Sequence, residues 1–437
     1  MAALAWCTVV LLCCVTGGGI WRWLRREGEV IAPLPVALGT IVVYIVPRAA
    51  YLLFFDRAPL TSAGLSHPRE LLLIAETTFA ALLGALALLS GHRADSAIRS
   101  GERLRLNVPD PDPRRVLWVG SAAALIGAIV LGYLFRSLGD LTYALSHQYE
   151  VNVLLEGKQS LFQLSRLLVI AVILLLVDPE SGKSRWWVWL LAAGVTLAYL
   201  PFGYRVLILL AAASPLALYH LTVRHLRLRL VIPSAVVAGA VLFGLGFARL
   251  LSARSVEQAV ATFSKHPLAA VHFVFNAAGE LKIFDATSIV VRDVPRVIPY
   301  NYGETFVRVP WMIVPRRLWR EKPMTSGHLI VQHYLPNLRT AYPPMAIGEF
   351  FAGGGWLGVL VGFFCIGWVS RAVWEWRRRH AGVGNASVYL LYCFFVFDFT
   401  RVGDPARTIW FLLIGASMTA FFFTVSASWR ATEGRSF

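Results

Sequence analysis

Residues 70–90 read ELLLIAETTFAALLGALALLS, and Glu70 and Glu76 are the only charged side chains in this run. An α-helix needs about 20 apolar residues to cross the hydrocarbon core of a bilayer. Comparable runs follow one another along the chain, so the sequence predicts an all-α, polytopic integral membrane protein. We expect about eleven transmembrane helices, near 3–21, 30–47, 70–90, 116–136, 161–178, 186–202, 206–222, 231–250, 346–370, 385–400 and 408–427.

The composition agrees with this class. Of the 437 residues, 57% are hydrophobic and only 15% are charged, and the mean hydropathy is +0.62. A soluble chain of this length carries far more charge, and an outer-membrane barrel would show short alternating segments. The five cysteines fall in apolar runs without metal-ligand spacing, so we expect neither disulfides nor a zinc site.

The net charge of +16 is explained by arginines that gather in alternate connections, and we expect no nucleic-acid partner. With the N-terminus outside, the inner connections hold 20 Lys and Arg, whereas the short outer connections hold about eight. The bias of Lys and Arg over short loops sets the orientation of a membrane protein. The sequence therefore predicts an external N-terminus and a cytoplasmic C-terminus.

The stretch 251–343 separates the helices predicted in 1–250 from those predicted in 344–437, and we expect it to be a long external loop. Within it, residues 311–323 read WMIVPRRLWREKP, a dense basic cluster. On the external side such a cluster is not needed as a cytoplasmic anchor. Arginine forks bind phosphate oxygens in pairs, so the cluster could hold a lipid pyrophosphate. Contact with lipid head groups, without any chemistry, is the alternative.

Further charged residues lie at predicted outer ends of spans. Arg205 is in LAYLPFGYRVLILL and Arg401 is in FFVFDFTRVGDPAR. A charge near bilayer depth costs a few kcal/mol, so it usually faces a cavity or a partner; snorkelling to the surface is the alternative. Glu349, in PPMAIGEFFAGGGWLG, could pair with an arginine, act as a base or bind a sugar. His333 and Arg339 are further candidates.

The order of GYR, YNYGETF, VPRRLWREKP, AIGEFFAGGGWLG and FTRVGD over roughly residues 200–405 resembles the Wzy-type O-antigen and exopolysaccharide repeat-unit polymerases. The resemblance implies a GT-C-like fold in the bacterial cytoplasmic (inner) membrane, with the active site on the external face. It implies a glycosyltransferase that polymerises polyprenyl-diphosphate-linked oligosaccharide repeat units into a surface polysaccharide, without a metal or another cofactor. Its partners would be the lipid-linked donor and acceptor, membrane lipids and a chain-length regulator protein.

In such a reaction a sugar hydroxyl attacks the anomeric carbon while a lipid pyrophosphate leaves, so placed cations would stabilise the developing charge. Arg205, Arg316 and Arg401 are the candidates for that role, and Glu349 or His333 is the candidate base. Which of Arg316 and its neighbour faces the pyrophosphate stays open. The substrate-binding candidates are Arg317, Arg320, Lys322, Arg339, Tyr300, Tyr302 and Trp319, the aromatic rings stacking on sugars or packing at the interface.

Other functions fit parts of this pattern. An O-antigen ligase would share the donor and differ in the acceptor. A GT-C glycosyltransferase that uses a polyprenyl-monophosphate sugar would place an acidic residue in the first outer loop, where Asp56 lies, but one phosphate needs fewer cations. A flippase for lipid-linked glycans would need no base. The only DxD pattern, Asp110-Pro-Asp112, falls on the predicted inner side, so no metal site is expected.

Overall fold

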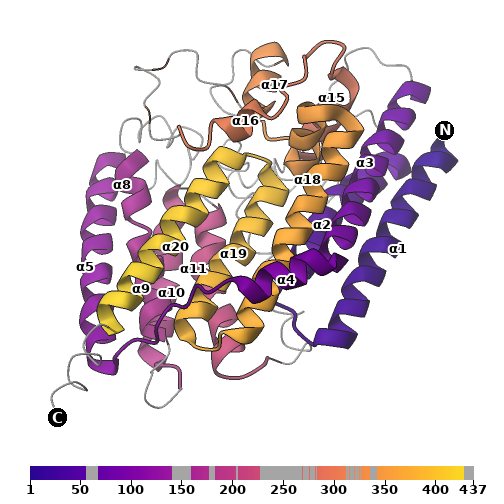
Figure 1. Cartoon of the computed structure of the whole chain (residues 1–437). Helices are drawn as coiled ribbons and strands as arrows, with labels where there is room; N and C mark the ends of the chain where they lie inside the picture. The colour runs from indigo at the N-terminus through magenta and orange to yellow at the C-terminus, as the bar shows by residue number, and fades with distance from the viewer. Residues whose placement is uncertain are drawn as a thin grey trace. The chain divides into compact units, whose positions relative to one another are not determined.

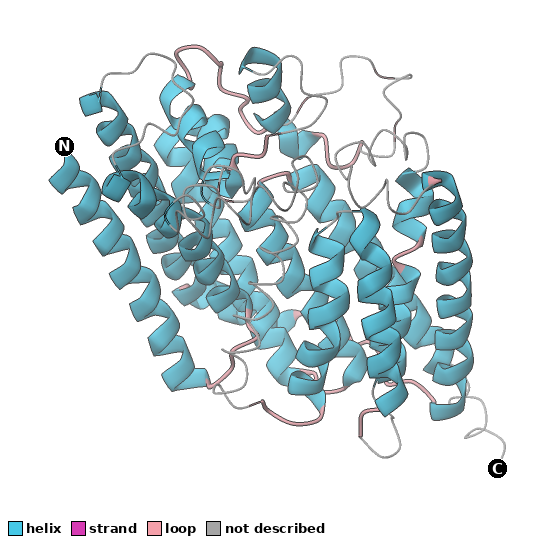
Figure 2. Ribbon diagram, turned by 180° about the vertical axis from the view of Figure 1, so that it is seen from behind, coloured by secondary structure: helices cyan, strands magenta, loops and turns pink. Residues whose placement is uncertain are grey.

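The computed structural model describes residues 1–55, 67–139, 159–176, 183–202, 205–226, 268, 275, 281, 283–311, 314, 319, 324, 326–334 and 342–427. These residues form helices and connections, with no strand among them (Figure 2). Within these ranges, seven helices are long and apolar enough to cross a membrane. They are α1 (Ala2–Glu27), α2 (Pro33–Phe55), α3 (His67–Arg93), α5 (Pro113–Leu138), α18 (Met345–Arg379), α19 (Val383–Val402) and α20 (Pro405–Ala427). The prediction of an all-helical, polytopic membrane protein is confirmed.

The chain divides into two compact units. The first unit comprises Met1–Leu104, His272–Arg379 and Tyr392–Leu413. The second comprises Arg105–Val271, His380–Leu391 and Ile414–Phe437. Stretches that lie far apart in the sequence therefore meet within each unit.

The first unit is built on α3 and α18, which run side by side (Figure 1). Glycines make this contact close: a Cβ atom on Gly91 would collide with the carbonyl oxygen of Phe364, and one on Gly367 with that of Leu88. Small residues let helix backbones approach in this way when there is no hydrophobic force between helices in lipid. Helix α1 packs along α3 and α2.

Shorter helices cover the two ends of α18 in this unit (Figure 1). Helix α4 (Asp95–Arg103) packs near its C-terminal end, where Gly101 approaches Ala372. Helix α15 (Ile283–Asp293) lies at its start, where the Thr287 hydroxyl donates to the Pro344 carbonyl at 2.6 Å. We call these the α4 end and the Glu349 end of the first unit.

Helix α18, which contains the predicted span 346–370, is broken near its start. Gly354 and Gly355 have non-helical backbone angles, and Gly355 has a φ of +60°. The chain changes direction at the break, so that Phe350 packs against the helix that follows. Its carbonyl oxygen would touch a Cβ atom on Gly358, and its ring would touch one on Gly362. Non-helical backbone at membrane depth is tolerated where protein buries it or where it lines a cavity. Residues 345–353 therefore form a separate short helical segment.

The stretch predicted as a long loop, 251–343, contains helical structure where it is described. Helix α15 is buried and contacts α2, α3 and α18. The hydroxyl of Thr77 on α3 donates to Ser288 on α15 at 2.9 Å. Helices α16 (Glu304–Val307) and α17 (Ser326–Tyr334) follow. Part of this stretch thus belongs to the packed body of the first unit.

The second unit contains α5, α8 (Gln159–Leu164), α9 (Leu167–Leu176), α10 (Trp186–Tyr199), η1 (Leu200–Phe202) and α11 (Arg205–Thr222). Its hydrophobic core includes Val116, Ile170, Leu174 and Phe423. The predicted span 161–178 is interrupted between α8 and α9. The predicted span 30–47 ends too early, because α2 continues to Phe55. The predicted span 231–250 lies outside the described residues.

Candidate functional site

Glu349 lies on the segment before the break in α18 and is 1% exposed. Within the described part of the chain, neither of its carboxylate oxygens forms an ion pair or a hydrogen bond of good geometry. Its nearest hydrogen-bonding groups are the hydroxyl groups of Thr305 and Ser326 and the Ser326 backbone N–H, and Asp404 is a further charged neighbour. Burying a carboxylate without a partner costs several kcal/mol. A buried polar group that is left unsatisfied in this way marks a candidate site.

The loop that carries Thr305 is fixed against the broken helix. The Asn301 backbone N–H donates to the Ala352 carbonyl at 2.9 Å, and its side chain accepts from the Gly303 N–H at 3.0 Å. The Asn301 amide also donates to Ser326 Oγ at 3.3 Å. Asn301 thereby fixes the turn that precedes Thr305 and contacts the Ser326 hydroxyl directly.

The two tyrosines of this loop differ in their surroundings. The Tyr300 hydroxyl lies 2.9 Å from the position that a Cβ atom on Gly355 would occupy, so it reaches the break itself. Tyr302 is 82% exposed, and its backbone has a φ of +42°. Non-glycine residues rarely adopt this conformation. Tyr300 therefore faces the break in α18, whereas Tyr302 is exposed at the surface.

The turn between α19 and α20 packs on the start of the same segment. Gly403, with a φ of +71°, leaves no room for a Cβ atom beside the Met345 carbonyl. Arg401, just before this turn, is buried and pairs with Asp398 at 2.9 Å. Arg407 reaches the other oxygen of Asp398 at 3.3 Å. Arg401 is thus oriented by a carboxylate on its own helix.

Phenylalanine rings connect the three stretches. The rings of Phe306 and Phe350 stack at 5.8 Å between centroids, and Phe350 meets Phe399 edge-on at 5.7 Å. These residues belong to YNYGETF, AIGEFF and FTRVGD, respectively. The structure therefore gathers three of the motifs singled out in the sequence around the segment that carries Glu349.

The sequence analysis missed a second buried charge in the first unit. Arg48, 1% exposed, donates from Nε and Nη2 to both oxygens of Asp285, at 3.1 and 2.8 Å. Its Nη1 donates to the Phe275 carbonyl at 2.6 Å. Burial and the charge of Asp285 raise the pKa of the nearby Tyr342 hydroxyl above its ordinary range. The available signal was an arginine inside the apolar run YIVPRAAYLLFF, just beyond the end of the predicted span 30–47.

The remaining described candidates are His333, which is exposed, and Trp319, which is half-buried. His333 is exposed on α17, with its ring 4.7 Å from that of Tyr334. The Tyr334 hydroxyl donates to Asp293, which accepts from Arg292 at 2.7 Å. Burial and this bond to Asp293 raise the pKa of Tyr334. The ring of Trp319, a further predicted substrate-binding residue, lies 6.4 Å from that of Trp311.

Most of the predicted cations lie outside the described residues. Arg205 begins α11 in the second unit, and its side chain is outside the described part of the chain. The residues of the basic cluster and its surroundings lie outside it altogether: Arg316, Arg317, Arg320, Lys322 and Arg339. Their convergence on one site stays a prediction.

Comparison of the chain with protein-family models, with curated protein sequences and with solved structures found no match. The fold and the site define an all-helical polytopic membrane protein with a buried, unpartnered carboxylate on a broken helix. Any functional assignment rests on that site and on the motifs around it.

Proposed function

We propose that this protein is a Wzy-type glycosyltransferase with a GT-C-like fold that polymerises polyprenyl-diphosphate-linked repeat units. One observation carries the proposal: YNYGETF, AIGEFF and FTRVGD, stretches from distant parts of the chain, meet around the unpartnered carboxylate of Glu349. A set of ordinary surface anchors would not require these stretches to pack together. The break in α18 supports the proposal too, since broken membrane helices line cavities and binding sites.

The reaction transfers a growing glycan to an acceptor sugar. The acceptor hydroxyl oxygen attacks the anomeric carbon of the donor, and the bond from that carbon to the diphosphate oxygen breaks. The diphosphate leaves with the bonding electron pair, and the hydroxyl proton passes to Glu349. A positioned base contributes about 10²–10⁴-fold to such a step. We favour Glu349 over His333 as the base, because Glu349 is buried beside the Thr305 and Ser326 hydroxyl groups, whereas His333 is exposed.

Negative charge develops on the departing diphosphate, so cations placed beforehand stabilise the transition state more than the ground state. Arg401 is our first candidate in the first unit, with Asp398 as its positioning residue. Arg205 and Arg316 are proposed to complete the clamp, and Tyr300 to contact a sugar ring near the break in α18. The proposed reaction needs no metal ion.

The proposed site faces the exterior of a bacterial cytoplasmic membrane. The count of Lys and Arg in the short connections supports this orientation. Lipid-linked repeat units would reach the site from the bilayer, and the polymer would grow on the outside. A chain-length regulator is a proposed partner.

The glycan pattern of a strain that lacks the protein tests this proposal. We expect surface glycan that carries single repeat units in place of a ladder, and a restored ladder when the wild-type chain is supplied. Undecorated lipid A core, with polymer retained on the carrier lipid, would contradict a polymerase and indicate a ligase. Loss of both single units and polymer from the surface would contradict it in favour of a flippase.

A further inference from the structure

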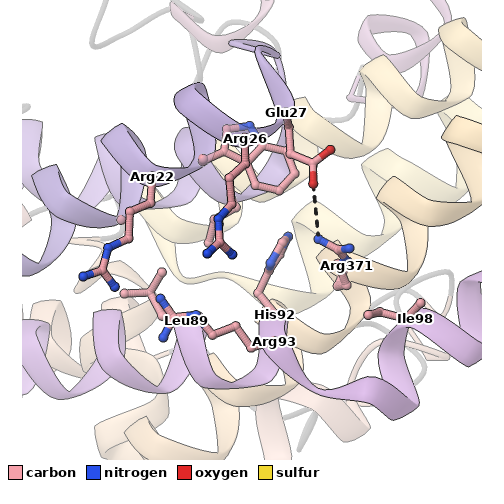
Figure 3. A pocket seen from close by; sticks show the side chains of 11 residues that line it. Arg22, Arg26, Glu27, Leu89, His92, Arg93, Ile98 and Arg371 are labelled. Atoms are coloured by element: carbon pink, nitrogen blue, oxygen red, sulfur yellow. Dashed lines mark ion pairs between the residues drawn. The ribbon is translucent and has the colours of Figure 1, made fainter.

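A cavity of about 590 Å³ lies in the first unit, at the α4 end, far along α18 from the segment that carries Glu349. Arginines from three helices line it: Arg22 and Arg26 on α1, Arg93 on α3 and Arg371 on α18. Figure 3 shows the side chains of α1 and α3 extending into the space between the two helices. Several cations thus converge from different parts of the chain.

The charge in this cavity is unbalanced. Arg22, Arg26 and Arg93 are exposed at its rim and form no ion pair with any described residue. Glu27 is the only acidic side chain in the lining, and it already lies 4.0 Å from Arg371 (Figure 3). It also lies 3.7 Å from Arg378. Three guanidinium groups therefore face a space that lacks a matching anion from the chain.

A buried histidine points into the same space. His92 is 5% exposed, and its Nε2 has no hydrogen-bond partner in the described ranges. Trp23 holds the imidazole edge-on at 5.1 Å between centroids, and the Trp23 indole N–H donates to the Glu29 carbonyl at 2.7 Å. In Figure 3 the imidazole projects from α3 toward the space beneath Arg26. Its position is fixed while its nitrogen lacks a partner.

The lining is also partly apolar. Leu34, Leu89 and Ile98 contribute to it together with the indole of Trp23. The volume falls within the range of about 300–1,000 Å³ typical of small-molecule sites. Basic cavities between membrane helices suit phospholipid head groups, because guanidinium groups bind phosphate while apolar side chains accept the start of an acyl chain. Loop arginines that served only as anchors would need neither a cavity nor a buried histidine.

We propose that this cavity binds the phosphate of an anionic phospholipid, with Arg22, Arg26 and Arg93 contacting its oxygens and His92 Nε2 completing the set. The inference is independent of the proposed glycosyltransferase reaction, which takes place around Glu349. The lipid would fasten α1 to α3 and α18 at the α4 end of the first unit.

The test uses the full-length chain, purified in a neutral detergent and stripped of lipid. Phosphatidylglycerol or phosphatidylcholine is titrated in, and bound lipid is counted by native mass spectrometry. The cavity variant is Arg22→Gln/Arg26→Gln/Arg93→Gln. The control variant, Arg25→Gln/Arg99→Gln/Arg103→Gln, removes the same charge from exposed residues of α1 and α4 that do not line the cavity. Arg26→Gln alone replaces the triple variant if the latter fails to fold.

We expect phosphatidylglycerol to bind wild type and the control alike, and the cavity variant at least about tenfold more weakly, because charge-assisted hydrogen bonds are lost. His92→Phe, which keeps the ring shape, should weaken binding a few-fold without lowering the melting temperature. Unchanged binding by the cavity variant, or an equal loss in the control, would overturn the proposal. Equal affinity for phosphatidylcholine would overturn the preference for an anionic headgroup.

A soluble competitor distinguishes a phospholipid phosphate from a free, soluble phosphate. Inorganic pyrophosphate at millimolar concentration should leave bound phosphatidylglycerol in place, because it makes no contact with Leu34, Leu89 or Ile98. Displacement of the lipid from wild type and from the control variant alike would assign the cavity to a soluble phosphate and overturn the lipid proposal.

Discussion

Two buried carboxylates in the first unit have opposite surroundings. Asp285 receives two hydrogen bonds from the guanidinium of Arg48, at 3.1 and 2.8 Å. Glu349, which is 1% exposed, forms no ion pair and no hydrogen bond of good geometry within the described chain, and only the Thr305 and Ser326 groups lie beside it as hydrogen-bonding neighbours. The first carboxylate ties α15 to α2, whereas the second lies beside a break in α18. A matched buried pair is explained by the fold it holds together, but an unmatched charge calls for a functional explanation.

Burial of a carboxylate alone therefore does not identify a functional site. Breaking a paired carboxylate leaves a buried arginine without its counterion, so the damage is structural. Neutralising an unpartnered carboxylate removes a desolvation cost, so the fold should tolerate it. Activity and stability should therefore separate at Glu349 and fall together at Asp285.

The largest effect is expected at Glu349. Glu349→Gln keeps the side-chain shape and removes the proposed base, so glycan elongation should fall about 10²–10⁴-fold. The melting temperature should stay the same or rise. Polymer ladders from cells measure elongation, and thermal unfolding of the purified variant measures the melting temperature. The matched control, Glu304→Gln, changes an exposed glutamate of α16 and should leave the ladder unchanged. A normal ladder in Glu349→Gln would remove Glu349 from the mechanism.

The Arg48–Asp285 pair should show the opposite behaviour. Asp285→Ala or Arg48→Ala leaves one buried charge uncompensated, which costs about 3–5 kcal/mol of stability. The double variant Arg48→Met/Asp285→Leu should recover most of this loss, because neither charge remains. Reversible unfolding in mixed detergent micelles gives the free energies. Single variants as stable as wild type would mean that the pair does not hold α2 to α15.

Arg401 combines features of the two cases: it is paired with Asp398, as Asp285 is with Arg48, but it belongs to the proposed site, as Glu349 does. Arg401→Ala should reduce elongation about 10²–10³-fold, the usual cost of losing one group that stabilises transition-state charge. Arg401→Lys should fail as well if paired N–H contacts matter. Arg407→Ala, at the more exposed partner of Asp398, is the control and should have a small effect. Full activity of Arg401→Lys would show that charge alone suffices.

The smallest effect concerns the packing that supports both carboxylates. Gly367→Leu inserts a side chain where α3 and α18 touch, so overpacking should cost about 1–3 kcal/mol. Gly17→Leu on α1 adds the same side chain where no atom lies within 4 Å and should cost less than about 0.5 kcal/mol. Equal stability of the two variants would contradict the close contact.

The sequence predicted an all-helical membrane protein because a membrane span has a simple requirement, a long apolar run. The run over 70–90 is long and apolar, and it forms α3. The break at Gly354–Gly355 escaped prediction because glycine lowers helix propensity without revealing which backbone angles the chain adopts. The Arg48–Asp285 pair joins residues 237 positions apart, and a hydropathy pattern does not reveal such a contact.

The candidate site was predicted in part. The sequence singles out Glu349 as a carboxylate at the outer end of a predicted span, and the structure adds that it is buried and forms no ion pair with a described residue. The sequence did not indicate that Asn301 would hold Thr305 and Ser326 around it, since their arrangement depends on a loop closed by tertiary hydrogen bonds. The convergence of Arg205 and Arg316 with Arg401 stays a prediction.

Elongation of purified, lipid-linked repeat units by the purified chain tests the central claim most directly. Wild type should extend units carried on polyprenyl diphosphate with or without a chelator, and Glu349→Gln should leave them as single units. Wild type that leaves diphosphate-linked units unextended, or extends only with a polyprenyl-monophosphate sugar, would contradict the account.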